Sequence, residues 1–240
     1  MKQQIHLSSE FGEIIDLYSL CVIDGTYHIF ILYKTDSENK KWGHFSTKDF
    51  LQYKFLSGKA DIIGHKPCTT HFFANTEDKT LTLELIKTPG KKAHTFLSLP
   101  REVIIRDEEL LKYPPKNLHD LREYKRKVNL QNGESSDTFG CIFEAILNFS
   151  ETDYTIKLRD DILVDCESGN FTVTYNGLSQ NFEAEDCKRV HVFSDNFSVE
   201  IFVGGKVLSL PTEYNTKGTV AVLKGQCRAE IYKLKSIKVL

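Results

Sequence analysis

The sequence contains no long run of apolar residues. No segment approaches the about 18 consecutive apolar residues that a membrane-spanning helix requires, so we expect no membrane partner. The N-terminal segment MKQQIHLSSEFGEI also lacks the apolar core of a secretory signal, which favours a cytoplasmic protein. Neither sign of charge is in excess, because 31 Lys and Arg residues stand against 33 Asp and Glu residues. Nucleic-acid binding needs clustered basic residues, and the one basic run, 122–127, fits a solvated helix face, so we expect no nucleic-acid partner.

Cysteine is sparse and scattered. None of the six cysteines forms a C-x-x-C pair, which argues against a disulfide scaffold and against the common zinc motifs. His65, Cys68 and His71 lie near one another in sequence, but their spacing is loose and a fourth ligand is not evident. We therefore expect reduced thiols and no metal site.

What the chain does have is a strong β pattern. The segment 19–33 reads as a hairpin, with strands over 19–23 and 26–33 around Asp24-Gly25, because Gly supplies the positive φ that a tight hairpin turn needs. Residues 79–87 alternate cleanly between apolar and polar and predict another strand. From Thr138 onward ten short runs, separated by turn residues, predict an antiparallel sandwich.

One helix interrupts this pattern. Residues 114–127, PPKNLHDLREYKRK, begin with prolines, place Leu118 and Leu121 on one face and end in basic residues, which predicts a helix. The polar run 129–137 after it predicts a linker, so we expect a domain boundary near 115–135.

Several local sequences then match one family in order and spacing. The segments LSLPREV (97–103), ELLKYPPKNLHDLR (109–122) and VHVFSDNFSVEIFVGGKVLSL (190–210) resemble its C-terminal motifs. Nearer the N-terminus, GTYHIFILYK (25–34) and WGHFSTKDFLQY (42–53) resemble its first motifs. The chain is similar to glycoside hydrolase family 32, the invertase-like β-fructosidases.

This resemblance implies an all-β fold, with partial β-propeller blades followed by a linker helix and a C-terminal antiparallel β-sandwich. It implies a truncated propeller-like catalytic remnant over 1–113, a linker helix and loop over 114–134, and the β-sandwich over 135–240. The implied activity is retaining hydrolysis of fructose-containing saccharides such as sucrose, sucrose 6-phosphate or fructans, without metal or organic cofactor. An Asp attacks the anomeric carbon and a Glu serves as acid and base.

The resemblance also assigns residues. Asp16 precedes Tyr27 by eleven positions, which is the interval of the family's catalytic nucleophile. Trp42 and His44 are candidate substrate-binding residues, and packing inside a blade is an alternative that is at least as well supported. For Asp49 we favour a turn or strand cap over sugar binding.

The chain departs from the family at the acid/base. The sequence has no Glu-Cys dipeptide and no Arg-Asp-Pro motif, which carry the acid/base and the sugar-stabilising Asp. Only about 96 residues precede Leu97, whereas five blades of about 40–50 residues need roughly 225. We therefore expect impaired or absent hydrolysis and a partner chain over the open propeller edges. The alternative is a non-catalytic carbohydrate-binding or interaction β-sandwich module.

Overall fold

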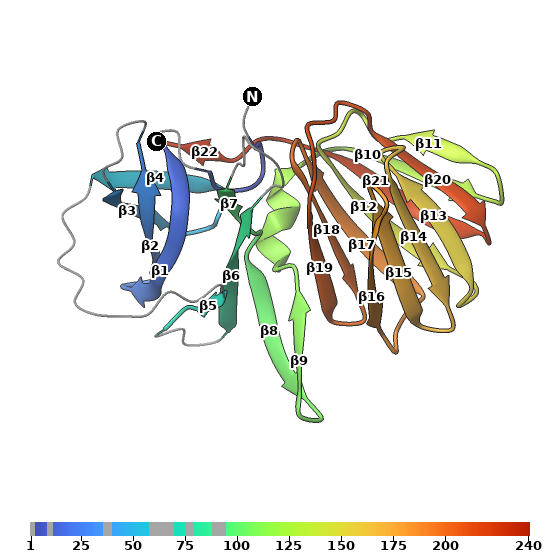
Figure 1. The fold of residues 1–240 in the computed structure, drawn as a ribbon, viewed down its shortest axis with the longest axis horizontal. Coiled ribbons are helices and arrows are strands. Elements are labelled where there is room, and N and C mark those ends of the chain that lie inside the picture. The colour runs from blue at the N-terminus through green and yellow to red at the C-terminus, as the bar shows by residue number, and fades with distance from the viewer. Residues whose placement is uncertain (1–2, 9–11, 36–39, 58–69, 75–78, 88–94) are drawn as a thin grey trace. The chain divides into compact units, whose positions relative to one another are not determined.

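The computed structural model describes residues 3–8, 12–35, 40–57, 70–74, 79–87 and 95–240, and it is built almost entirely of antiparallel β-sheet (Figure 1). The chain forms two compact units. Unit 1 comprises Met1–Leu121 together with Ser236–Leu240, and unit 2 comprises Arg122–Lys235. No helix in the described part of the chain has the length and hydropathy needed to cross a bilayer. The all-β prediction is confirmed.

The first sheet of unit 1 has the order β1-β2-β3-β4-β22. Its strands are β1 (Glu13–Ile23), β2 (Thr26–Lys34), β3 (Lys40–Thr47), β4 (Gln52–Ser57) and β22 (Lys238–Val239). The predicted hairpin is confirmed, with Asp24 and Gly25 at φ 48° and 68° between β1 and β2. Strand β22 adds in parallel to β4, so the last residues of the chain cover the β4 edge.

The second sheet of unit 1 contains the remaining strands that precede the linker. They are β5 (Thr70–Phe72), β6 (Thr80–Lys87), β7 (Thr95–Leu97), β8 (Arg101–Arg106) and β9 (Glu109–Tyr113). Leu17, Ile31 and Phe45 of the first sheet share one buried core with Leu81 and Leu83 of β6. The described residues of unit 1 thus form two sheets with one hydrophobic interior.

The helix predicted over 114–127 is confined to a short 3₁₀ helix, Lys116–Leu121. Its buried Leu118 and Leu121 are three residues apart, which is the repeat of a 3₁₀ helix. The basic residues that follow form β10 (Arg122–Leu130), which pairs with β21 along its length. Backbone pairing with a neighbouring strand therefore overrides the helical pattern of the local sequence. The run predicted as a linker ends β10, turns at 131–134 and enters β11 (Ser135–Asp137).

Unit 2 is a sandwich of two six-stranded sheets, in the orders β10-β21-β12-β17-β18-β19 and β11-β20-β13-β14-β15-β16. The strands not yet named are β12 (Phe143–Phe149), β13 (Tyr154–Leu158), β14 (Ile162–Glu167), β15 (Asn170–Tyr175), β16 (Leu178–Glu183), β17 (Arg189–Asp195), β18 (Ser198–Val203), β19 (Lys206–Pro211), β20 (Thr219–Lys224) and β21 (Cys227–Leu234).

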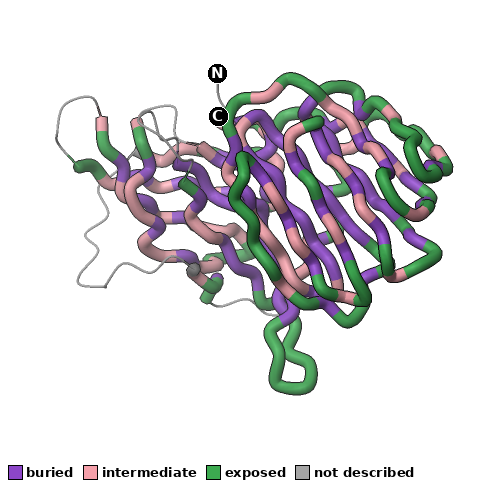
Figure 2. Tube along the Cα trace, turned by 45° about the vertical axis from the view of Figure 1, so that its right-hand side comes forward, coloured by how far each residue is buried: buried purple, intermediate pink, exposed green. Residues whose placement is uncertain are grey.

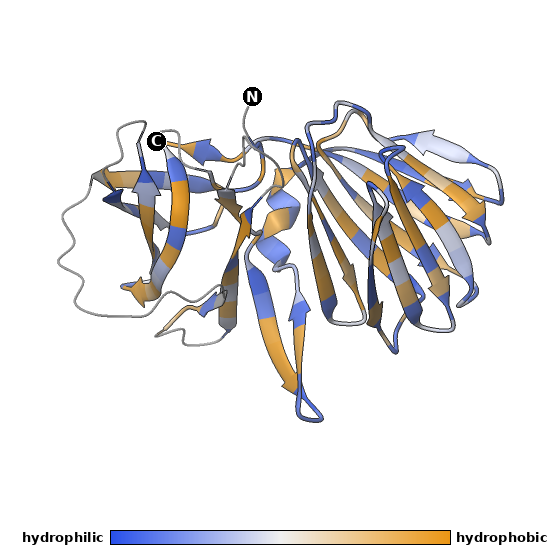
Figure 3. Ribbon diagram, viewed as in Figure 1, coloured by the Kyte–Doolittle hydropathy of each residue, from blue (hydrophilic) through white to orange (hydrophobic). Residues whose placement is uncertain are grey.

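The sandwich core comes from alternate residues of both sheets. Phe143, Ala145 and Leu147 of β12 face Ile156, Val164 and Val173 of the opposite sheet within one buried cluster. Buried and exposed positions alternate along β13–β15 (Figure 2), and hydropathy alternates with them (Figure 3). This period of two is the pattern that predicted a sandwich from the sequence.

Candidate functional site

Asp16, Trp42 and His44 lie on the same face of the first sheet, opposite its buried core. Asp16 is aligned with Leu32 on β2, and Leu32 is aligned with Trp42 on β3. His44 is aligned with Phe30 in the next row. Aligned residues on neighbouring strands project to the same side of a sheet. We call this surface the β1–β4 face.

Two bulges in β1 create this arrangement. The register shifts between Ile14 and Asp16 and again between Leu17 and Ser19. Buried residues consequently recur every three positions, at Ile14, Leu17 and Leu20. A bulge adds one residue to one strand and turns the following side chains, so Asp16 stays on the β1–β4 face while Ile14 and Leu17 enter the core.

Half-buried aromatic rings line the face beside Asp16. The rings of Tyr18 and Trp42 meet edge to face, with centroids 4.5 Å apart. Phe30 stacks on His44 at 4.3 Å. Tyr18 was not predicted from the sequence, because its contact with Trp42 depends on the register of β1.

His44 is also paired with a second histidine. Nδ1 of His28 lies 2.8 Å from Nε2 of His44, so one ring donates a hydrogen bond to the other. Burial and the neighbouring His28 both lower the pKa of His44. The pair therefore favours neutral imidazole, which leaves an N–H able to donate to a ligand hydroxyl.

Asp16 is half-buried and forms no hydrogen bond or ion pair with the described residues. Retaining glycosidases need a second carboxyl group about 5–5.5 Å from the nucleophile, with a raised pKa. Glu13, the nearest candidate in sequence, is exposed and accepts a hydrogen bond from Thr95 at 3.4 Å. Glu10 lies outside the described residues.

Glu84 of β6 is a carboxylate held by two cations. It forms ion pairs with Arg101 at 2.5 Å and Lys112 at 2.6 Å. Burial opposes its ionisation, but these two cations outweigh burial and lower its pKa. A general acid needs the opposite shift, so Glu84 is fitted to stabilise the second sheet rather than to donate a proton.

The remaining candidates have structural roles or lie outside the described residues. Asp49 accepts hydrogen bonds from the backbone N–H groups of Leu51 and Gln52, and so acts as the turn cap that we predicted. His65 and Cys68 are outside the described residues. In the part of the chain that the structure covers, no group of three or more His, Cys, Asp or Glu residues is arranged to hold a metal ion.

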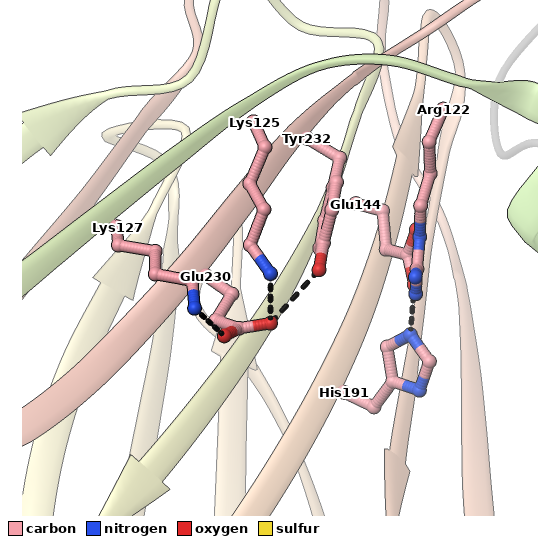
Figure 4. A network of polar contacts seen from close by, with 7 residues as sticks. All are labelled: Arg122, Lys125, Lys127, Glu144, His191, Glu230 and Tyr232. Atoms are coloured by element: carbon pink, nitrogen blue, oxygen red, sulfur yellow. Dashed lines mark hydrogen bonds and ion pairs between the residues drawn. The ribbon is translucent and has the colours of Figure 1, made fainter.

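Unit 2 carries a separate polar network on one face of its first sheet (Figure 4). The buried Glu144 accepts two hydrogen bonds from Arg122, at 2.6 and 2.5 Å, and contacts Nε2 of His191 at 2.6 Å. Burial disfavours the Glu144 carboxylate, but these partners outweigh burial and lower its pKa. This arrangement holds three strands together, because Arg122, Glu144 and His191 lie on β10, β12 and β17.

A second carboxylate extends this network towards solvent. Glu230 pairs with Lys125 at 2.8 Å and Lys127 at 3.3 Å, and it accepts a hydrogen bond from Tyr232. Hydrogen bonds from Lys125, Tyr232 and Lys127 lower the pKa of Glu230 to about 2.

The sandwich should lose stability as pH falls from about 5 to about 2. Both Glu144 and Glu230 have folded-state pKa values below the unfolded value of 4.5. Their contribution to the free energy of unfolding is therefore present above pH 4.5, and it is lost as each carboxylate protonates in the folded state. Solvent screens the ion pairs of the half-buried Glu230, so the larger share belongs to Glu144. Urea unfolding followed by circular dichroism at pH 6, 4 and 3 measures this loss. Glu230→Gln should flatten the pH profile, and a profile of unchanged shape would contradict the assignment.

Comparison with known proteins gives a fold match without a close sequence relative. No protein-family model matches the chain, and no curated protein matches its sequence. Among solved structures, the Bombyx mori β-fructofuranosidase in complex with sucrose is 14% identical, with a TM-score of 0.64 over 95% of this chain and 67% of that one. Sucrose-6-phosphate hydrolase from Lactobacillus gasseri is 13% identical, with a TM-score of 0.63 over 91% of this chain and 65% of that one.

A third structure agrees with these two. Exo-inulinase from Aspergillus awamori is 12% identical, with a TM-score of 0.67 over 98% of each chain. The chain spans about two thirds of the length of the first two structures. Because the three share this architecture at such low identity, the chain has the fold of the glycoside hydrolase family 32 proteins, in which sheets of the propeller type are followed by a β-sandwich.

Proposed function

We propose that the chain binds fructose-containing saccharides on the β1–β4 face and that, by itself, it hydrolyses them poorly or not at all. The observation that carries the proposal is the alignment of Asp16, Trp42 and His44 on one half-buried face. The structures of the same fold include an enzyme in complex with sucrose and one in complex with 1-kestose. Such ligands are our candidates for this chain.

The binding chemistry follows from the side chains of the face. Aromatic rings pack against the C–H surfaces of sugars, and Trp42 supported by Tyr18 offers such a ring. An imidazole N–H of His44 and the carboxylate of Asp16 can bond sugar hydroxyls. A half-open face excludes little water, so we expect affinities in the millimolar range, on the order of 4 kcal/mol.

The expected weakness of hydrolysis follows from the lack, among the described residues, of a second carboxyl group placed to act with Asp16. In the retaining mechanism the carboxylate forms a bond to the anomeric carbon while a general acid protonates the leaving oxygen. Without the acid the leaving group departs as an alkoxide, at a cost of about 10²–10⁴-fold in rate. Loss of substrate positioning adds to this cost.

Hydrolysis is tested by fructose release from sucrose, sucrose 6-phosphate and inulin. We expect the purified chain and its Asp16→Asn variant to release fructose at the same rate, at or near background. The variant differs from the wild type only in an amide nitrogen that replaces one carboxylate oxygen of Asp16. A contaminating hydrolase would therefore release fructose equally in both preparations. Release by the wild-type chain that exceeds Asp16→Asn by more than the slow residual rate left without a general acid would overturn the claim of impaired hydrolysis.

Binding is tested by fluorescence, because Trp42 is the only tryptophan in the chain. Titration with sucrose, fructose or 1-kestose should change Trp42 emission with saturation in the millimolar range. Tyr18→Ala should weaken binding about fivefold, because it removes the ring that supports Trp42. Leu178→Ala, at an exposed position of the sandwich, is the matched control. No saturable response at 100 mM saccharide would refute binding on this face.

Two further outcomes address the remaining alternatives. Calorimetric heat without a change in Trp42 emission would assign saccharide binding to the β-sandwich instead, as a non-catalytic module. The proposal also includes a partner polypeptide over the sheet edges that a two-sheet unit leaves open. Cooperative unfolding of the isolated chain as a stable monomer would contradict that part. All five described cysteines are free thiols, which suits a reducing compartment such as the cytoplasm.

A further inference from the structure

A cluster of basic side chains occupies the end of the β1–β4 face opposite Asp16. His28 is aligned with Ser46 on β3, and Ser46 is aligned with Lys54 on β4. Lys238 of β22 is aligned with Gln52, two residues before Lys54 on the same side of β4. With His44, which bonds to His28, these residues form what we call the basic corner.

The C-terminal strand fixes Lys238 in this corner. The backbone N–H of Lys238 donates to Leu51 at 2.9 Å, and that of Leu240 donates to Tyr53 at 2.7 Å. Phe55 N–H donates in turn to the Leu240 oxygen at 3.1 Å. Val239 packs against the core, so the preceding Lys238 projects from the opposite face, where Lys54 lies.

Among the described residues, no carboxylate forms an ion pair with a cation of the basic corner. Within the described residues, Lys54 and Lys238 form no ion pair, and the two histidines bond only to each other. Asp16, an acid on the same face, lies one row from His44 and two rows from His28, the latter at roughly 13 Å along the strands. That separation exceeds the Debye length of about 8 Å at physiological ionic strength. In the second sheet of unit 1, by contrast, the cations Arg101 and Lys112 are both neutralised by ion pairs with Glu84.

The donors of this corner match those that bind phosphate groups. The corner offers two ammonium groups, two imidazole rings and the Ser46 hydroxyl. Neighbouring strands are spaced about 4.8 Å apart, so the flexible lysine side chains can reach over the histidines. A phosphate dianion accepts charge-assisted hydrogen bonds from ammonium groups and ordinary ones from a neutral imidazole N–H and from hydroxyls. We propose that the basic corner, formed by His28, His44, Lys54 and Lys238, is a binding site for a phosphate group. This site goes beyond the proposed saccharide function, because it involves a different ligand group and shares only His44 with the saccharide site.

Inorganic phosphate is the first probe, and the imidazole resonances of His28 and His44 are the readout. At constant ionic strength, we expect phosphate to shift both resonances with saturation in the low millimolar range. Lys54→Met combined with Lys238→Met should weaken this binding at least about fivefold. Lys41→Met is the matched control, since Lys41 is an exposed lysine of β3 aligned with the core residue Tyr33. Non-saturable shifts, or equal loss in the control, would overturn the site.

A second arm identifies the source of the phosphate group. Fructose 6-phosphate that displaces inorganic phosphate and binds more tightly would support a phosphorylated ligand, and equal affinities would support free phosphate. If the chain binds saccharide but not phosphate, this inference is refuted and the proposed function stands. If it binds phosphate but not saccharide, the proposed function is refuted and this inference stands.

Discussion

Glu144→Ala is expected to destabilise unit 2 by about 3–5 kcal/mol, because it leaves Arg122 and His191 partly buried without their anion. The carboxylate is fully buried and joins three strands of one sheet. Folded domains are stable by only about 5–15 kcal/mol, so a loss of this size should lower the urea midpoint of unit 2 greatly. Circular dichroism reports the unfolding of the whole chain, and Trp42 emission reports the unfolding of unit 1. The two signals together distinguish the unfolding of unit 2 from that of unit 1.

A double variant tests whether the loss comes from unpaired charge. Arg122→Met with Glu144→Leu removes both charges and retains apolar volume, so we expect it to be less destabilising than Glu144→Ala. Lys125→Met, which removes an exposed ion pair with Glu230, should cost under about 1 kcal/mol and is the control. A Glu144→Ala variant as stable as this control would mean that the network contributes little to folding.

The sequence could predict much of the fold, because its local patterns agree with the final pairing. Asp24-Gly25 specifies its hairpin through backbone conformation alone, and the alternation along Phe171, Val173 and Tyr175 identifies the buried face of β15. Both signals are local, so they need no knowledge of distant strands.

The β1–β4 face could be predicted only in part. Resemblance to a family singles out Asp16, Trp42 and His44 separately, but their common face depends on the register between strands. The two bulges of β1 place buried residues three apart, a spacing that period-two reasoning does not anticipate. The same dependence hides Tyr18, whose contact with Trp42 follows from the second bulge. Lys238 joins the face only because β22 pairs with a strand almost 200 residues earlier.

The segment 114–127 was predicted incorrectly for a related reason. Its prolines and its leucine pair do produce a helical turn, but only as far as Leu121. Beyond that residue, Tyr124, Lys125 and Arg126 bond to β21, whose sequence lies more than 100 residues away. A pattern confined to one segment cannot carry that information, and charged residues on an edge strand resemble those on a helix face.

Arg159→Leu is expected to cost about 3 kcal/mol, because this buried side chain links the two sheets of the sandwich. Arg159 lies in the turn between β13 and β14, at φ 56°, and its side chain is fully buried. Its guanidinium donates to the carbonyl of Asp195 at 3.0 Å, at the end of β17 in the other sheet, and to that of Glu213 at 3.3 Å. The substitution removes one donor from each carbonyl, at about 1–3 kcal/mol each, less the desolvation of the charge that is removed.

Two matched variants show whether geometry or charge is responsible. Arg159→Lys keeps the charge, but a compact ammonium cannot reach both carbonyls as the planar guanidinium does, so we expect roughly half the loss. Asp160→Ala, next in the same turn, removes an exposed contact with Lys217 and a hydrogen bond from Thr219, and should cost under about 1 kcal/mol. Urea unfolding by circular dichroism ranks the three variants. Equal loss in Arg159→Lys and Arg159→Leu would mean that both carbonyl bonds require the fork of the guanidinium, whereas no loss in either would refute the link between the sheets.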